Sequence, residues 1–436
     1  MAAQSFCIGR QKGLNRLIVA KMGKIFRVCL VTPGHLGSNP RLVKEADALV
    51  EAGYEVHVIA GDSYADARIR DASILEQAKW SVKIIPLRPD RATYFCRRLR
   101  QMICRTLFSA GFRTSFIAAR AHHALVPALT AAAVAVRADI YIGHCLAALP
   151  AVVRAGSKNR ARIGFDAEDF HSGEAEDHGR GRLENAIART LESTLLARCD
   201  HFTAASPLIA EAYEHQYGVK ACPVLNVFPL KEAVDPQPAP QIPSFYWFSQ
   251  TIGPGRGLEE FIAILRRWQR AVRLDLRGHV TEIYGRQLEE KVRGTEIDLR
   301  LLAPDVPKSM VRNAAGYTAG LGLELGAPRN RDLCLTNKAF TYLLAGVPVI
   351  LSRTRAQDRL AADLGDASLL IDLKDVEGAA GRLAGWLGDP AIQQKARLAA
   401  FRLGRSRYNW DWEKRLYLEK IASLGPQGGT AEGNSP

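Results

Sequence analysis

The sequence lacks the cysteine patterns and long apolar runs that are typical of metal-binding, disulfide-bonded or membrane-spanning proteins. Its eight cysteines are scattered, without a CxxC pair or a His/Cys spacing typical of a zinc site. We therefore expect no metal, and free thiols in a reducing cytoplasm. No run of 18 apolar residues occurs, so no transmembrane helix is predicted. The apolar run LIVA near the start is too short for a signal peptide.

Acidic residues are missing from two segments, and this accounts for the net charge of +14. Residues 1–27 contain six Lys and Arg and no acid, and residues 91–137 contain eight Arg and no acid. Elsewhere basic and acidic side chains are equal in number. The excess charge therefore belongs to the first half of the chain.

The second basic segment contains a predicted amphipathic helix over residues 94–108. Its apolar face comprises Phe95, Leu99, Met102, Ile103 and Leu107, and its basic face comprises Arg97, Arg98, Arg100 and Arg105. Such a helix favours contact between the arginines and an anionic membrane, here the inner face of the plasma membrane. The alternative is a solvated Arg-rich face on a helix whose apolar side packs against the core. Nucleic acid is not expected, because no aromatic platform or DNA-binding motif accompanies the arginines.

The order of apolar segments predicts an α/β protein. At 436 residues, the chain is long enough for two domains of roughly 200 residues each. Strands that alternate with helical segments are expected at 25–31, 56–60, 83–87, 139–144, 162–165, 245–248, 274–276, 299–302 and 349–351. Residues 229–243 are rich in proline and predict a linker between the two halves.

Residues 335–352, LTNKAFTYLLAGVPVILS, predict a short helix followed by a buried strand. Gly346 and Pro348 indicate the helix stop, and the apolar run 349–351 is typical of a parallel strand. Asn337 and Lys338 then lie at the helix N-terminus, where unpaired N–H groups suit a phosphate. Taken alone, the segment also fits an ordinary unit of a doubly wound fold.

A second predicted anion site follows the strand at 245–248. Residues 249–259 read SQTIGPGRGLE and lead into a helix. Glycines such as Gly255 let the backbone approach a pyrophosphate, and Arg256 can bind two phosphate oxygens. In the first half, Gly34 and Gly37 lie in a loop after the strand at 25–31, and that loop also allows close approach to a ligand.

Six blocks of the chain, in order, resemble the retaining family-4 glycosyltransferases of the GT-B fold. The NKAFTYLLAGVPVI block is similar to the family's NK-x-FEY-x-x-AG-x-PVI motif, and Arg41 with Glu45 matches its R-x-x-x-EA motif. The resemblance implies two Rossmann-like βαβ domains that face a cleft, with a C-terminal helix crossing back to the first. The expected parts are a basic tail (1–23), an acceptor-side domain (24–228), a linker (229–243), a nucleotide-sugar domain (244–406), a crossover helix (407–424) and a disordered tail (425–436).

The resemblance also implies roles for particular residues. The predicted catalytic residues are His144, Arg256 and Lys338, with His144 beside the donor sugar. The predicted donor-binding residues are Gly255, Arg256, Glu324, Asn337, Lys338 and Thr341. The predicted acceptor-side residues are Gly34, Gly37, Arg41, Asp166 and Glu168, the last two in the 166–174 loop.

Two departures from the family pattern concern the donor site. Gln250 stands where the first of two basic residues is usual, so one cation is missing unless Lys338 supplies it. Thr341 stands where the second glutamate of the Glu-x7-Glu signature falls, and Leu333 occupies the first position. Glu324 is close enough in sequence to replace the first glutamate.

The resemblance implies a metal-independent hexosyltransferase that moves a sugar from a UDP- or GDP-sugar with retention and needs no cofactor. The acceptor is expected to be a lipid-linked or cell-surface glycan, as in polysaccharide biosynthesis, and the protein to be cytoplasmic or peripheral on the plasma membrane. A non-catalytic GT-B protein that binds a sugar nucleotide or a partner is the first alternative, and a sugar-nucleotide epimerase is the second.

Overall fold

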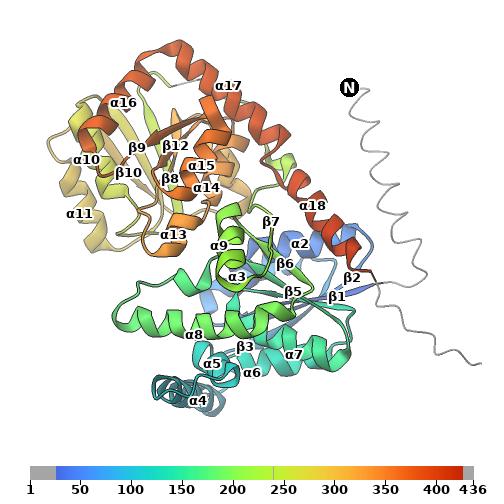
Figure 1. Cartoon of the computed structure of the whole chain (residues 1–436). Helices are drawn as coiled ribbons and strands as arrows, with labels where there is room; N and C mark the ends of the chain where they lie inside the picture. Colours follow the sequence, from blue (N-terminus) through green and yellow to red (C-terminus); the bar gives the residue numbers. More distant parts are fainter. Residues whose placement is uncertain (1–25, 239, 426–436) are drawn as a thin grey trace, which may run out of the picture. The chain divides into compact units, whose positions relative to one another are not determined.

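The computed structural model describes residues 26–238 and 240–425, and the predicted basic tail lies outside them. This part of the chain divides into two compact units (Figure 1). Unit 1 comprises the described residues up to Ala205, Ile209–Val224 and the residues from Lys414 onward, and unit 2 comprises Ser206–Leu208 and Leu225–Glu413. The last helix, α18 (Trp410–Ser423), begins in unit 2 and ends in unit 1, so the predicted C-terminal helix is confirmed.

Unit 1 contains a seven-stranded parallel sheet in the order β3-β2-β1-β4-β5-β6-β7. Its strands are β1 (Arg27–Thr32), β2 (Glu55–Asp62), β3 (Ser81–Pro86), β4 (Ile140–His144), β5 (Arg162–Ala167), β6 (His201–Ala204) and β7 (Cys222–Pro223). Its helices are α2 (Pro40–Glu51), α3 (Ala65–Leu75), α4 (Arg91–Ser109), α5 (Ser115–His122), α6 (Val126–Ala135), α7 (Leu149–Asn159), α8 (Gly179–Leu195) and α9 (Pro207–Tyr217). The strands predicted at 25–31, 56–60, 83–87, 139–144 and 162–165 are confirmed.

Unit 2 contains a six-stranded parallel sheet in the order β10-β9-β8-β11-β12-β13. Its strands are β8 (Ser244–Ile252), β9 (Val272–Val280), β10 (Ile297–Leu302), β11 (Ala319–Gly322), β12 (Val349–Ser352) and β13 (Ser368–Ile371). Its helices are α10 (Leu258–Trp268), α11 (Glu282–Val292), α12 (Met310–Ala314), α13 (Arg329–Leu333), α14 (Asn337–Leu344), α15 (Arg355–Leu364), α16 (Val376–Gly388) and α17 (Pro390–Ser406).

Both sheets reverse their winding at one point, between β1 and β4 in unit 1 and between β8 and β11 in unit 2. In doubly wound sheets, ligands bind outside the carboxyl ends of the strands at such a point. The loop that contains Gly34 follows β1, and His144 ends β4. The loop that contains Arg256 follows β8, and Glu324 follows β11. The topology therefore puts predicted site residues at the reversal point of each sheet.

The helix-strand unit predicted at 337–351 is confirmed as α14 and β12. Gly346 adopts a positive φ of 67°, and the Val347 N–H donates to the Tyr342 carbonyl at 2.9 Å, which closes the helix. The Tyr342 hydroxyl donates to the Tyr246 carbonyl at 3.0 Å, which ties α14 to β8. Gly320 in β11 is required beneath that ring, because a Cβ there would lie 2.1 Å from it. These contacts hold the start of α14 in a fixed place beside the sheet.

No single helix among the described residues has the length and apolarity needed to cross a membrane. The helices α5 and α6 have the required length and apolarity only when they are counted together as one segment, and that segment is bent by 109° between them.

Candidate active site

The loop after β8, which is predicted to bind a pyrophosphate, contains two glycines in the left-handed region of backbone conformation. Gly255 and Gly257 both adopt positive φ, 73° and 76°. A Cβ on Gly257 would lie 2.8 Å from Leu373 Cδ1 and 3.1 Å from Leu323 Cβ, so only glycine fits there. Gly257 directly precedes α10, which directs the N–H groups of that helix toward the turn.

The first turn of α14 lies in the same unit and offers further donors. Asn337 is its first residue, and the Thr336 side chain does not cap the helix. Instead, Thr336 Oγ1 accepts a hydrogen bond from Lys338 Nζ at 3.2 Å. Lys338 is buried, and its Nζ lies 5.2 Å from the centre of the Trp247 ring. Burial lowers the pKa of Lys338, although the Glu324 carboxylate opposes this shift.

A third cation, Arg331 of α13, belongs to this group. Its Nη1 donates to Glu324 Oε2 at 2.9 Å and lies 3.5 Å from the Gly255 carbonyl oxygen. Burial lowers the pKa of Arg256, and the nearby positive charge of Arg331 lowers it further. Arg256, Arg331 and Lys338 are therefore close enough to influence one another, and Glu324 faces them as a buried carboxylate. We call these four residues the donor cluster.

Arg331 was not among the residues predicted from the sequence. Because Gln250 occupies a usual basic position, the sequence predicted that one cation is missing unless Lys338 supplies it. Gln250 is exposed where the register of β8 shifts. The signal that could have identified Arg331 is the basic run GAPRNRDL between Glu324 and Asn337. Sequence spacing alone did not show that α13 brings this arginine back to Glu324.

Thr341 lies deeper in α14 than a ligand-binding residue normally does. Its side chain is fully buried, and Oγ1 donates to the Asn337 carbonyl at 3.1 Å within the same helix. Glu324 is fixed at its backbone, where its N–H donates to Ser352 Oγ at 2.6 Å. The donor-binding role of Thr341 stays a prediction, and Glu324 is the carboxylate that the structure places among the cations.

In unit 1, the predicted acceptor-side residues Arg41 and Asp166 form a buried ion pair. Arg41 Nε and Nη2 donate to the two Asp166 oxygens, each at 2.6 Å, and Nη1 donates to the Val224 carbonyl at 2.5 Å. Thr203 Oγ1 also donates to Asp166. Burial alone would lower the pKa of Arg41, but Asp166 and Glu45 raise it. Burial alone would raise the pKa of Asp166, but the charges and hydrogen bonds of Arg41 and His144 together lower it.

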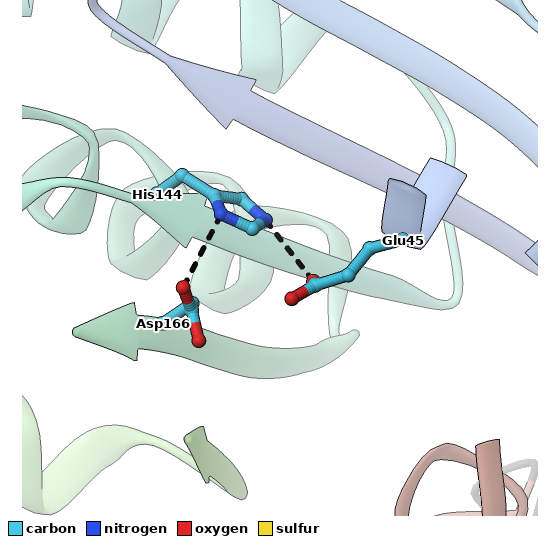
Figure 2. A group of neighbouring side chains, drawn as sticks. All are labelled: Glu45, His144 and Asp166. Carbon is cyan, nitrogen blue, oxygen red and sulfur yellow. Dashed lines mark ion pairs between the residues drawn. The ribbon is translucent and has the colours of Figure 1, made fainter. Parts of the chain in front are cut away.

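His144 joins this pair to Glu45, as Figure 2 shows. Its Nε2 lies 3.3 Å from Glu45 Oε2, and its Nδ1 lies 3.5 Å from Asp166 Oδ2. Burial would lower the pKa of His144, but the two carboxylates raise it to about 10. The imidazole has no exposed surface. Direct contact between His144 and a sugar therefore stays a prediction, and the observed contacts are those of a buried charge network.

The carboxylates of Glu45 and Asp166 and the His144 ring lie close enough to form a potential metal-binding group. Arg41, however, already occupies both Asp166 oxygens and places a permanent positive charge beside them. A divalent cation would meet that charge directly. The arrangement therefore favours a protonated His144 over a bound metal ion.

The remaining acceptor-side residues lie in the loops after β1 and β5. The Gly37 N–H donates to Asp71 Oδ1 at 2.8 Å, and the Gly34 carbonyl accepts from the Gly61 N–H at 3.1 Å. Glu168 follows β5, and burial together with the Asp166 charge raises its pKa to about 7. Glu168 can therefore gain or lose a proton near neutral pH.

The sequence matches no protein-family model and no curated protein sequence. Solved structures do match over nearly the whole chain. HepE from Anabaena, solved with UDP and glucose, superposes with a TM-score of 0.66 at 15% identity, over 92% of this chain and 100% of that one. Sucrose-phosphate synthase from Thermosynechococcus elongatus gives 0.65 at 13%, over 92% and 99%. The lipopolysaccharide outer core galactosyltransferase WaaB gives 0.59 at 13%, over 92% and 100%.

These likenesses confirm the predicted GT-B fold, with its two Rossmann-like sheets and a C-terminal helix. At 13–15% identity they show the fold alone, because one fold can carry several reactions.

Proposed function

We propose that this GT-B chain transfers a sugar from a nucleoside diphosphate donor to an acceptor, with retention at the anomeric carbon. The donor cluster is the observation that supports the proposal. It holds Arg256, Arg331 and Lys338 against the single carboxylate of Glu324, beside the uncapped first turn of α14. An excess of about two positive charges at one place suits a bound diphosphate.

In the proposed reaction, the bond between the anomeric carbon and the diphosphate breaks while the acceptor oxygen bonds to that carbon. Negative charge grows on the leaving diphosphate, where Arg256 and Lys338 stabilise it together with the N–H groups of Asn337 and the Gly255 turn. The leaving phosphate takes the proton of the acceptor hydroxyl. No protein nucleophile is needed, which agrees with the lack of the usual glutamate at Thr341.

On the acceptor side, Arg41 and His144 position the strand ends that carry Asp166 and Glu168. Asp166 is held by ion pairs on two sides. Glu168, with its raised pKa, is the group in this loop that can accept a hydrogen bond from an acceptor hydroxyl or donate one. Gly34, which has space at its Cβ position, leaves room for a ligand at the end of β1. Gly37 instead packs against Arg70 and donates its N–H to Asp71.

Two of the similar structures suggest the substrates to try first. HepE binds UDP and glucose, so UDP-glucose is the first donor, before the GDP-sugars. WaaB is a lipopolysaccharide galactosyltransferase, so lipid-linked and cell-surface glycans are the first acceptors. Polysaccharide assembly at the cytoplasmic face of a membrane is the setting that these substrates imply.

The test is thermal stabilisation by UDP, GDP and their sugars. A ligand at about 100 times its Kd adds about 2.7 kcal/mol, which corresponds to roughly 5–10 °C for a unit of this size. We expect Arg256→Ala, Arg331→Met and Lys338→Ala each to lose most of the shift. Arg266→Gln, an exposed arginine of α10, is the matched control and should keep it. Absence of a shift with every nucleotide would overturn the proposal.

Turnover separates the proposal from its alternatives. Sugar transfer releases the nucleoside diphosphate only when an acceptor is present and attaches the sugar to it. A non-catalytic protein, which the buried Thr341 favours, would bind the nucleotide without release. An epimerase would change the sugar without an acceptor.

A further inference from the structure

The apolar face of α4 points away from the body of unit 1. We call Phe95, Leu99, Met102, Ile103 and Leu107 the apolar stripe. Phe95 is 66% exposed, Met102 is 59% exposed and Ile103 is 49% exposed. Phe112 and Phe116, just beyond the stripe, are about 60% exposed as well. The exposed phenylalanines of the described chain all lie within residues 95–116.

The arginines of α4 fix this orientation, because several of them face inward. Arg97 Nη1 donates to the Leu87 carbonyl at 3.2 Å, Arg100 Nη2 to the Ala124 carbonyl at 3.2 Å, and Arg105 Nη1 to Glu184 Oε2 at 3.1 Å. The alternative in which the apolar side of this helix packs against the core is therefore wrong. The predicted membrane contact through Arg97, Arg100 and Arg105 is wrong as well, because these three side chains bond to other groups of unit 1. An exposed apolar face of this size marks an interaction surface.

Beside this surface, a hollow of about 490 Å³ is lined by three arginines, Arg113, Arg182 and Arg189. Arg113 follows the end of α4, and its guanidinium lies 5.7 Å from the ring centre of Phe108. Arg182 and Arg189 lie on α8, which contacts α5, and α5 contacts α4, the outermost of these helices (Figure 1). Arg189 pairs with Asp177 at 3.3 Å. Neither Arg113 nor Arg182 pairs with a carboxylate within residues 26–238 and 240–425.

We propose that this part of unit 1 docks on a membrane that carries anionic phospholipids. The apolar stripe, with Phe112 and Phe116, enters the boundary between headgroups and acyl chains, and the arginine-lined hollow takes headgroup phosphates. The proposal concerns an interaction surface and does not depend on the proposed sugar transfer.

Charge decides between this partner and the others. Residues 91–137 contain no acid, and Arg91, Arg98 and Arg113 are exposed there, so a second copy of the surface would place like charges opposite each other. Nucleic acid would satisfy the arginines but leave the apolar stripe in water. An anionic membrane offers phosphate and an apolar interior at one surface, and it therefore matches both features.

Cosedimentation with vesicles tests the proposal. The full-length protein is spun with phosphatidylcholine vesicles, and with vesicles containing about one third phosphatidylglycerol, at low and high salt. We expect at least ten-fold stronger binding to the anionic vesicles at low salt, weakened by salt.

Three variants locate the surface. The stripe variant, Phe95→Ser/Met102→Ser/Ile103→Ser, should lose binding to anionic vesicles. The hollow variant, Arg113→Gln/Arg182→Gln, should lose the preference for anionic over neutral vesicles. Ile283→Ser/Ile392→Ser/Leu398→Ser changes three exposed apolar residues of unit 2 and should bind like the wild type. All five altered side chains outside the control are exposed or line the hollow, so unchanged melting curves are expected and show that each variant is folded.

Three results would overturn the proposal. Binding of the stripe variant to vesicles at the wild-type level would place the contact elsewhere. Sedimentation without lipid could show a wild-type dimer that the stripe variant dissociates, which would assign the stripe to a second copy. If RNA of equal charge displaces the protein from the vesicles, and the stripe variant binds that RNA as well as the wild type does, the arginines are assigned to nucleic acid.

Discussion

Replacing Arg41 with Met should destabilise unit 1 strongly, because it removes the guanidinium from a buried network and keeps most of the apolar stem. Arg41 is fully buried and donates to both oxygens of Asp166 and to the Val224 carbonyl. Without it, the two carboxylates of Asp166 and Glu45 face only one cation, His144. Removing one partner of a buried ion pair typically costs about 3–5 kcal/mol.

Hydrogen exchange followed by mass spectrometry measures this effect within unit 1. A loss of about 4 kcal/mol corresponds to roughly a thousand-fold faster exchange of the amides that open with the unit. We expect this acceleration in peptides covering β4 and β5, next to the network. Peptides covering β11 and β12 of unit 2 serve as the internal control and should exchange at nearly wild-type rates.

Two further variants make the reasoning refutable. Arg41→Lys keeps the positive charge but loses the bidentate geometry, so its effect should be intermediate. In Arg41→Met/Asp166→Asn, the unpaired charge is also removed, so the double variant should be less destabilised than the sum of the single ones. Wild-type exchange of β4 and β5 in Arg41→Met would show that the ion pair contributes nothing and that our account of the network is wrong.

Three more predictions concern pH and backbone conformation. Folding raises the pKa of His144 from 6.5 to about 10, so its contribution to the free energy of unfolding is complete below about pH 6.5 and is lost as pH rises through 10. The difference in free energy of unfolding between wild type and His144→Gln, measured by urea denaturation, should narrow over this range by about 4–5 kcal/mol. Folding also raises the pKa of Glu168, from 4.5 to about 7, so ionisation of this carboxyl lowers stability as pH rises through that window. Glu168→Gln should therefore gain about 2 kcal/mol on wild type between pH 5 and pH 8, and an unchanged difference would contradict the shift. Gly257→Ala should lower the Tm through a loss of about 1–3 kcal/mol, because of its positive φ and its contact with Leu323, whereas Gly253→Ala, with open space around it, should not.

The fold could be predicted from the sequence because its signals are local. The apolar run 349–351 and the Gly346 stop specify a helix and a strand within a few residues of each other, and α14 and β12 appear where that pattern predicts them. The βα alternation then restricts the topology to a doubly wound sheet, in which the strand ends that bind ligands are known in advance. Gly255 and Arg256 were predicted as site residues because they follow such a strand end.

The rest of the candidate site depends on contacts between residues far apart in sequence. Arg331 reaches Glu324 only because α13 folds back after β11, and no local pattern shows this. The orientation of α4 could not be predicted from the sequence either. Its sequence has two faces, and the hydrogen bonds from Arg97 and Arg100 to carbonyls of other segments determine which face is turned inward.

Charge balance distinguishes the roles of the two buried clusters. In unit 1, Arg41 and His144 face Asp166 and Glu45, so two positive charges meet two negative ones and the network is complete without a ligand. Such a closed network can hold strand ends in place, but it has little electrostatic reason to bind another ion. The donor cluster of unit 2 carries three cations and one carboxylate, and its lysine is buried at an energetic cost that lowers its pKa. A bound diphosphate would carry about the negative charge that balances the excess of positive charge in this cluster. For this reason, nucleotide binding should raise the pKa of Lys338, and the protein–nucleotide complex should form with proton uptake above neutral pH. Calorimetry in buffers of different ionisation enthalpy measures this uptake directly.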